Sequence, residues 1–294
     1  MLHIQEYLDY LKFEKRFSEH TICAYKTDLE QFSLFISLNY QCTHPQDVSH
    51  RFVRNWIVAL MEEKITPRSV NRKLSALKSF YKYLLRQGLL KVSPMDKVVA
   101  PKTKKRLPVF VEEKQMNTLI DIVEFEDSFI GIRNKLIIEM FYYTGMRLSE
   151  LIGLKIQDIE LGNLTIRVLG KRNKERLIPI TSHFTERLNE YLHQRSLQAG
   201  NDNHWLFISE KGNKMYPIAI YRIINGYLKL VTSIEKKSPH VLRHTFATHM
   251  LNNGADLNAI KELLGHANLA ATQVYTHNTF EKLKRVYKLS HPRA

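Results

Sequence analysis

Three short segments in the second half of the sequence bring together residue types that could act on a phosphate group. The segments are Thr144–Leu151, Ser238–Thr245 and Leu264–Tyr275, and a lysine-rich stretch, Gly170–Lys174, lies between the first two. Each residue alone has an ordinary explanation, such as a helix-surface ion pair or a buried aromatic ring. In combination, two arginines, several histidines, a lysine and a tyrosine match the needs of phosphoryl transfer without a metal.

The chemistry explains this choice of residues. A phosphodiester under attack accumulates negative charge on its equatorial oxygens, and the guanidinium forks of Arg147 and Arg243 could hold them. The attacking phenol of Tyr275 must lose a proton and the 5′-alkoxide leaving group must gain one, which histidine and a partly desolvated lysine can provide. A tyrosine ester keeps the energy of the broken bond, so rejoining needs no ATP.

Other chemistries built from the same segments are weaker. His240, His244 and His249 suggest zinc, but Arg243 among them would repel a cation and the spacing lacks an acidic partner. A magnesium nuclease would need clustered carboxylates, whereas Asp256 and Glu262 are the acids between His240 and Tyr275. No Walker-type glycine-rich loop occurs. We therefore expect neither a metal nor another cofactor.

The elements that must position these residues fall into two halves. The apolar spacing predicts helices throughout residues 1–97, with starts near Leu2, near Ser18, near Asp47 and at Thr66-Pro67. Residues 98–108, with two prolines and a run of cations, predict an extended linker. Residues 109–294 predict a second, mixed domain.

In the second domain, β-type runs at residues 164–169 and 176–181 flank Gly170–Lys174, which is typical of a β-hairpin. Trp205–Ser209 is a candidate for one further short strand. The remaining elements are predicted helices at residues 111–123, 129–143, 185–198, 218–230, 240–252, 257–264 and 279–289.

The net charge of +15 favours a polyanionic partner, and nucleic acid is the first candidate. The predicted helix after Thr66 contains no acid between Pro67 and Gly88, so salt bridges within that helix are excluded. We expect its cations and a hydroxyl to contact DNA, and we expect the same of the linker lysines. The predicted DNA contacts are Arg68, Ser69, Arg72, Lys73, Lys102, Lys104 and Lys105.

The cysteine content and the hydropathy pattern suggest that the protein is intracellular. Cys23 and Cys42 form no metal-type cluster and no disulfide framework, and the helical pattern around Cys23 predicts a buried thiol. The N-terminal residues alternate charged with apolar side chains, unlike a signal peptide, and no run is long enough to span a membrane. The sequence therefore predicts a cytoplasmic protein.

The segments TGMRLSEL, GKRNKERLIPI, SPHVLRHTFATHMLNNGADL and LLGHANLAATQVYTH resemble the motifs of tyrosine recombinases, the phage integrase family. The resemblance extends over nearly the whole chain and is greatest to the Xer-type recombinases that resolve bacterial chromosome dimers. It implies catalytic roles for Arg147, Lys171, His240, Arg243, His266 and Tyr275, with Tyr275 as nucleophile and Lys171 as the acid for the 5′-oxygen. Lys174 stays an alternative to Lys171, and Glu150 matches a supporting acid.

By resemblance, the fold is mainly α with a small antiparallel β-sheet. An N-terminal four-helix, SAM-like core-binding domain would join a mixed α/β catalytic domain, and the two would grip duplex DNA. Four protomers, homo- or heterotetrameric with a paralogue, would exchange strands between two duplexes through a Holliday junction, and a DNA translocase could activate them. The apolar stripe after Tyr275 could pack internally or dock on a neighbouring protomer, and the resemblance favours docking.

Three other functions stay open at this point. The first is an integrase of a phage or mobile element, which uses the same chemistry. The second is a type IB topoisomerase, which shares the Arg, His and Tyr set but relaxes supercoils as a monomer. The third, of another class, is a non-catalytic DNA-binding protein, against which the complete residue set argues.

Overall fold

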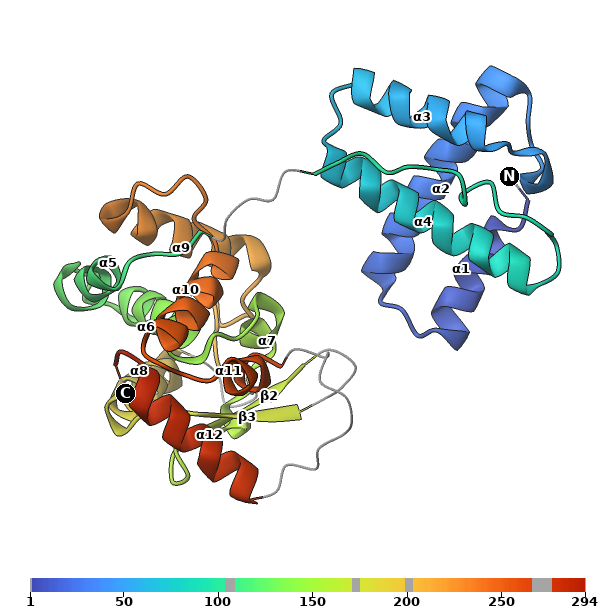
Figure 1. Cartoon of the computed structure of the whole chain (residues 1–294). Coiled ribbons are helices and arrows are strands. Elements are labelled where there is room, and N and C mark those ends of the chain that lie inside the picture. Colours follow the sequence, from blue (N-terminus) through green and yellow to red (C-terminus); the bar gives the residue numbers. More distant parts are fainter. Residues whose placement is uncertain (1, 104–108, 171–174, 199–202, 266–276, 294) are drawn as a thin grey trace. The chain divides into compact units, whose positions relative to one another are not determined.

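The structure, a computed structural model, describes residues 2–103, 109–170, 175–198, 203–265 and 277–293. It divides into two units, Met1–Arg106 and Leu107–Ala294 (Figure 1). Each unit buries an apolar core of its own. This division agrees with the size at which a single hydrophobic core stops growing.

The first unit is helical, because its apolar residues recur at helical spacing and converge on one core. The N-terminus of α4 forms as the sequence predicts: Thr66 Oγ1 accepts a hydrogen bond from the Ser69 N–H at 3.3 Å, and Pro67 occupies the first turn. The elements are α1 (Ile4–Asp9), a π-helical turn (Tyr10–Glu14), α2 (Glu19–Tyr40), a 3₁₀ turn (Pro45–Asp47), α3 (His50–Glu62) and α4 (Pro67–Arg86).

Cys23 corrects one expectation, because it is exposed. The buried residues of α2 include Leu29, Phe32 and Ile36. Successive residues of an α-helix rotate by about 100°, so Cys23 lies on the side opposite to this stripe. The local pattern predicted the helix correctly but did not fix which side faced the core.

The second unit combines helices with one small sheet. Its elements are α5 (Glu113–Asn117), a π-helical turn (Thr118–Ile122), α6 (Phe129–Thr144), α7 (Leu148–Gly153), a 3₁₀ turn (Ile156–Asp158), β1 (Ile159–Glu160), β2 (Thr165–Leu169), β3 (Glu175–Pro179), α8 (Ser182–Gln198), α9 (Pro217–Val231), α10 (Pro239–Asn252), α11 (Leu257–Leu263) and α12 (His277–Ser290). The fold class is therefore mainly α with a small antiparallel sheet, as predicted.

The sheet is an antiparallel meander in the order β1-β2-β3, with Val168 opposite Arg176 and Ile166 opposite Ile178. Its β2–β3 hairpin is the predicted one. Strand β3 packs against α11 and α12 (Figure 1). The sheet therefore holds the hairpin beside the end of α11, where the candidate site lies.

Trp205–Ser209 does not form the suggested strand. Trp205 bridges to Lys155 and Ile208 bridges to Lys214, each as an isolated antiparallel pair. The two ends of this stretch therefore pair with different segments, so no continuous ladder of hydrogen bonds develops.

Helix α6 lies at the centre of the second unit, packed against α8, α9 and α10. It is apolar on nearly all sides, which is the pattern of a helix enclosed by others. Its C-terminus leads through Gly145 directly into α7. The buried core of the second unit thus extends to Thr144–Leu151, the first of the three candidate segments.

Helix α12 packs against α10 and α11 of the same chain. Its docking on a neighbouring protomer, which the resemblance favours, stays a prediction. Leu283 and Tyr287 are buried in a cluster with residues of α10 and α11, among them Phe246 and Ile260. Beyond the helix, His291 is buried and stacks on Tyr143 and Tyr287. The residues after α12 therefore pack against the core of the second unit, to which they belong.

Crossing a membrane would require a long apolar helix, and the described part of the chain contains none.

Candidate active site

Arg147 stands at the N-terminus of α7 and is held by Glu150, three residues later. The Glu150 carboxylate accepts hydrogen bonds from the Arg147 backbone N–H and from Nη1, both at 2.7 Å. Arg147 Nη2 donates to the Gly265 carbonyl at 3.0 Å. The Arg147 side chain is 31% exposed. Its guanidinium is thus anchored on one side and accessible on the other.

Arg243, on α10, is a buried cation. Its Nη1 donates to the Gly145 carbonyl and its Nη2 to the Leu264 carbonyl, both at 2.7 Å. Burial, together with the positive charge of Arg147 nearby, lowers the pKa of Arg243 to about 10. Arg243 therefore remains a cation at neutral pH, and its forked shape fits two carbonyls at once.

Two glycines make this close packing possible. Gly145 has φ +58°, and a Cβ there would lie 2.5 Å from Phe246 Cδ1 and 2.8 Å from Leu264 Cδ2. Gly265 has φ +64°, and a Cβ there would lie 3.1 Å from Arg176 Nη1. The left-handed backbone favours glycine at both positions, and at Gly145 the contacts leave no room for a side chain. The motif glycines are thus explained by backbone geometry.

His240 occupies the first turn of α10, after Pro239. Although His240 is exposed on the surface, desolvation of its ring by the surrounding protein and the neighbouring positive charge of Arg243 lower its pKa from the ordinary value. Arg147 contributes in the same direction. At neutral pH the imidazole is therefore uncharged and able to accept a proton.

Arg176 is a member of this cluster that the sequence reasoning missed. It lies on β3, is 5% exposed, and donates Nη1 and Nη2 to the two Glu150 oxygens at 2.9 and 2.8 Å. The sequence could have indicated this burial, because Arg176 and Ile178 are two residues apart in a predicted strand and therefore point to the same, inward face. An arginine at an inward position needs a buried partner.

The structure therefore brings together Arg147, His240 and Arg243 from three of the predicted catalytic positions. Lys171, His266 and Tyr275, and the alternative Lys174, lie outside the described residues. His266 directly follows Gly265 in the sequence, and Gly265 accepts a hydrogen bond from Arg147.

The predicted DNA contacts on α4 need one correction. Lys73 is 7% exposed, and its ammonium binds Asp28 of α2 at 3.1 Å and also Gln31. It is occupied inside the helix bundle and presents no free charge to a phosphate. The absence of acids within the helix excluded salt bridges inside α4, but it did not exclude a partner on another helix.

Arg72 also binds Asp28, with Nη2 at 2.9 Å from Oδ1, although half of its side chain is exposed. Arg68 and Lys102 are exposed, and the Ser69 hydroxyl lies 3.0 Å from Thr66 Oγ1. Lys104 and Lys105 lie outside the described residues. The accessible cations of the first unit therefore include Arg68, Arg72 and Lys102.

In the described parts of the chain, no group of three or more His, Cys, Asp and Glu could hold a metal ion. His249, one of the histidines weighed for zinc, is buried with Nδ1 2.9 Å from the Tyr142 hydroxyl. It is therefore part of the packing between α6 and α10.

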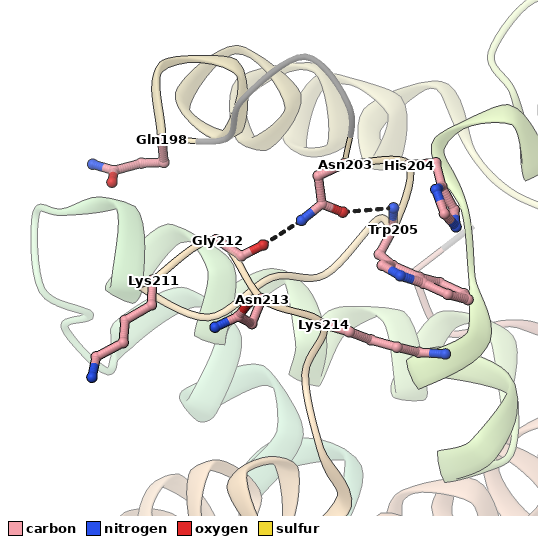
Figure 2. A pocket seen from close by; sticks show the side chains of 8 residues that line it. All are labelled: Gln198, Asn203, His204, Trp205, Lys211, Gly212, Asn213 and Lys214. Atoms are coloured by element: carbon pink, nitrogen blue, oxygen red, sulfur yellow. Dashed lines mark hydrogen bonds between the residues drawn. The ribbon is translucent and has the colours of Figure 1, made fainter.

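An open pocket of about 480 Å³ lies between the end of α8 and the loop at residues 211–214 (Figure 2). Asn203 crosses it, donating to the Gly212 carbonyl and accepting from the Trp205 N–H. Lys214 Nζ lies 3.3 Å from the centre of the Trp205 ring. The three predicted catalytic residues that the structure describes, Arg147, His240 and Arg243, do not line this pocket.

Comparison with known proteins identifies both units. Residues 109–282 match the phage integrase family, and residues 4–88 match the phage integrase N-terminal SAM-like domain. Tyrosine recombinase XerC of Staphylococcus saprophyticus is 40% identical over 99% of this chain and 97% of its own. XerC of Bacillus licheniformis is 39% identical over 98% of this chain and 95% of its own.

Solved structures share the fold. The XerH site-specific recombinase bound to difH substrate has a TM-score of 0.68 at 23% identity, covering 95% of this chain and 83% of its own. The Tn1549 transposon integrase in complex with circular intermediate DNA has a TM-score of 0.70 at 18% identity, covering 95% and 97%. Because the family match spans most of both units and the relatives align along almost the entire chain, the protein belongs to the phage integrase family as a tyrosine recombinase, an enzyme that cuts DNA strands and rejoins them.

Proposed function

We propose that this recombinase acts at a specific DNA site in the manner of the Xer enzymes, with Tyr275 as its nucleophile. The observation that carries the proposal is the convergence of Arg147 and Arg243 on the consecutive carbonyls of Gly265 and Leu264. Two cations fixed beside the segment that leads to His266 and Tyr275 suit the charge of a phosphodiester under attack.

In the proposed reaction, the Tyr275 oxygen forms a bond to the scissile phosphorus and the bond from phosphorus to the 5′-oxygen breaks. The phenol proton passes to a base, for which neutral His240 is suited, and Lys171 supplies a proton to the 5′-oxygen. Arg147, Arg243 and His266 bind the non-bridging oxygens. The 3′-phosphotyrosyl ester is then attacked by a 5′-hydroxyl of the partner strand, which releases Tyr275 without ATP.

The biological role that we propose is resolution of chromosome dimers at cell division, in the cytoplasm. Identity near 40% to proteins named XerC supports it. The substrate would be a double-stranded recombination site, bound by a homo- or heterotetramer on two duplexes, with a paralogous recombinase and a DNA translocase as possible partners. Strand exchange would proceed through a Holliday junction.

In the first unit, we propose that Arg68, Ser69 and Arg72, at the start of α4, contact backbone phosphates. We propose the same contact for the lysines of the predicted linker at residues 98–108, which are Lys102, Lys104 and Lys105. Phosphate contacts add affinity and orientation but carry little sequence information. Lys73 does not belong to this set, because its ammonium is buried against Asp28.

Covalent trapping tests the function. A nicked duplex carrying a candidate Xer-type site lets the short fragment diffuse away after attack, which blocks rejoining. We expect a denaturation-resistant protein–DNA adduct with the natural protein and none with Tyr275→Phe, which should still bind the duplex. Binding without an adduct in the natural protein would contradict the catalytic proposal and favour a DNA-binding role. Trapping only on a mobile-element end would favour an integrase.

A further inference from the structure

We infer that Arg176 is a positioning residue for the phosphoryl transfer, acting through Arg147. The inference rests on the proposed function of Arg147. Arg176 is 5% exposed and makes three hydrogen bonds: Nε donates to the Leu263 carbonyl at 2.8 Å, and the two Nη groups bind the Glu150 carboxylate. Within the described part of the chain, these bonds join Arg176 to Leu263 and Glu150, so we expect its effect on the reaction to pass through these neighbours.

The first effect of Arg176 is on the charge of Arg147. Glu150 is buried, and each of its oxygens accepts one hydrogen bond from Arg147 and one from Arg176. Burial alone raises the pKa of Glu150, but the hydrogen bonds and charge of Arg176, together with the hydrogen bonds of Arg147, outweigh this and lower it to about 2. The carboxylate is therefore ionised at neutral pH.

Two arginines thus share one carboxylate, and one positive charge is left over. The side chain of Arg176 is 5% exposed and that of Arg147 is 31% exposed, so the uncompensated charge is available on the Arg147 side. Without Arg176, Glu150 would neutralise Arg147 alone and compete with the phosphate for its donors. Arg176 therefore preserves the charge of Arg147 for the substrate.

The second effect of Arg176 is on the geometry of the site. The carbonyls of Leu263, Leu264 and Gly265 accept hydrogen bonds from Arg176, Arg243 and Arg147, in that order. These carbonyls belong to the C-terminal end of α11, where the helix dipole favours cations. Three guanidiniums from β3, α10 and α7 thus bind consecutive residues. Arg176 is the member that connects this end to the hairpin.

The hairpin connection is direct in sequence. Arg176 is the second residue of β3, which begins four residues after Lys171 in the sequence. By binding both Leu263 and Glu150, Arg176 fixes the start of β3 relative to α7 and α11. One side chain thereby links the chain before His266, the helix of Arg147 and the strand after Lys171.

The test measures single-turnover cleavage of the nicked duplex by Arg176→Met and Arg176→Lys. We expect Arg176→Met to lower the cleavage rate by roughly 10–100-fold, the scale seen when a group that orients a reacting side chain is removed, with little change in DNA affinity. Arg176→Lys keeps a positive charge beside the Glu150 carboxylate, so it should cleave faster than Arg176→Met and more slowly than the natural protein. Arg133→Met is the matched control, because Arg133 is 6% exposed and donates to the Ile208 carbonyl and to Asn134.

A double variant separates positioning from general structural support. If Arg176 acts through Arg147, Arg176→Met should cost little further rate in an Arg147→Ala background. Full additivity of the two losses, or an equal loss in Arg133→Met, would overturn the inference. If Arg176→Met does not fold, the same cycle with Arg176→Lys decides the question.

A second readout does not depend on activity. In protein labelled with ¹⁵N-arginine, the side-chain signals of Arg147 should show hindered rotation that is lost or shifted in the Arg176 variants and kept in Arg133→Met. Unchanged Arg147 signals would overturn the positioning role even if cleavage fell. If the natural protein formed no adduct, the proposed function would fail, while these signals would still decide how Arg176 affects Arg147.

Discussion

At the scale of single residues, hydrogen bonds to backbone carbonyls orient the arginine side chains of the site. Arg243 donates one Nη group to the Gly145 carbonyl and the other to the Leu264 carbonyl. A guanidinium held in this way needs little rearrangement when charge develops on a substrate. Lysine has the same charge but cannot bind two carbonyls as a planar fork.

This difference leads to a prediction for Arg243→Lys. We expect the single-turnover cleavage rate to fall by roughly 10²–10³-fold, because one ammonium cannot hold Gly145, Leu264 and a phosphate oxygen together. Duplex affinity should change little, as a gel-shift titration would show. Arg285→Lys, at an exposed position of α12, should cleave normally. A loss of less than about tenfold would refute the role given to Arg243.

At the scale of elements, α4 combines two kinds of cation that the sequence did not separate. Lys73 shares the buried face with Leu77 and Phe80 and reaches Asp28, which is itself fully buried. Arg68 lies on the exposed face one turn earlier. Helical spacing from Leu77 and Phe80 places Lys73 on the inner face of α4, so its burial could be predicted from the sequence. Its partner Asp28 lies on another helix, and only the three-dimensional structure shows that pairing.

We therefore expect opposite effects from two substitutions in α4. Lys73→Met should lower the free energy of unfolding by roughly 1–3 kcal/mol, because Asp28 keeps Arg72 but loses a buried partner, and it should leave DNA affinity unchanged. Arg68→Ala should leave stability unchanged, weaken duplex binding and reduce the salt slope by about 1.

Both α4 variants can be measured in the whole chain. Fluorescence of Trp56 in a Trp205→Phe background reports unfolding of the first unit, and titration of a labelled duplex reports binding. Loss of DNA affinity with normal stability in Lys73→Met would show that the ammonium leaves Asp28 to bind DNA.

The end of α12 provides a pH-dependent element. His291 Nδ1 accepts a hydrogen bond from the Arg293 N–H, and Nε2 donates to the Tyr142 carbonyl, both at 3.1 Å, which fixes the neutral ring. Burial lowers the pKa of His291 to about 4, with His249 and Arg293 contributing. Arg293 in turn binds Asp121 with two N–H groups at 2.8 and 2.6 Å.

Because the folded pKa lies below the ordinary value of 6.5, His291 stabilises the fold fully above pH 6.5. This contribution is lost as pH falls from 6.5 to about 4. The stability difference between the natural protein and His291→Gln should therefore narrow over that range, by an amount on the order of 2–3 kcal/mol. Urea unfolding at pH 7.5 and pH 5 would measure it, and a constant difference would contradict the prediction.

At the scale of the whole molecule, accessible cations occur in both units, in keeping with the net charge of +15. If six to ten of them contact phosphates, duplex affinity should fall by roughly 10³–10⁵-fold between 50 and 200 mM salt. Titrations at several salt concentrations, with a site-bearing duplex and a scrambled one, would measure both slopes. Affinity independent of salt would contradict binding through these charges.

Much of this architecture could be predicted from the sequence, because it depends on patterns with a fixed period. The start of α4 at Thr66 and the β2–β3 hairpin follow from cap chemistry and alternation. Long-range pairing could not be predicted in this way. Arg176 with Glu150, and the split pairing of Trp205 and Ile208, join segments whose separation in sequence carries no periodic signal.

The sharing of Glu150 also constrains how the protein can evolve. A lineage that replaced Arg176 would leave a carboxylate that suppresses Arg147, so the next tolerated change would fall at position 150. Substitutions at 147, 150 and 176 should therefore be strongly epistatic. In a library randomised at these three positions, active survivors should be rare, and they should retain one net positive charge among the three residues.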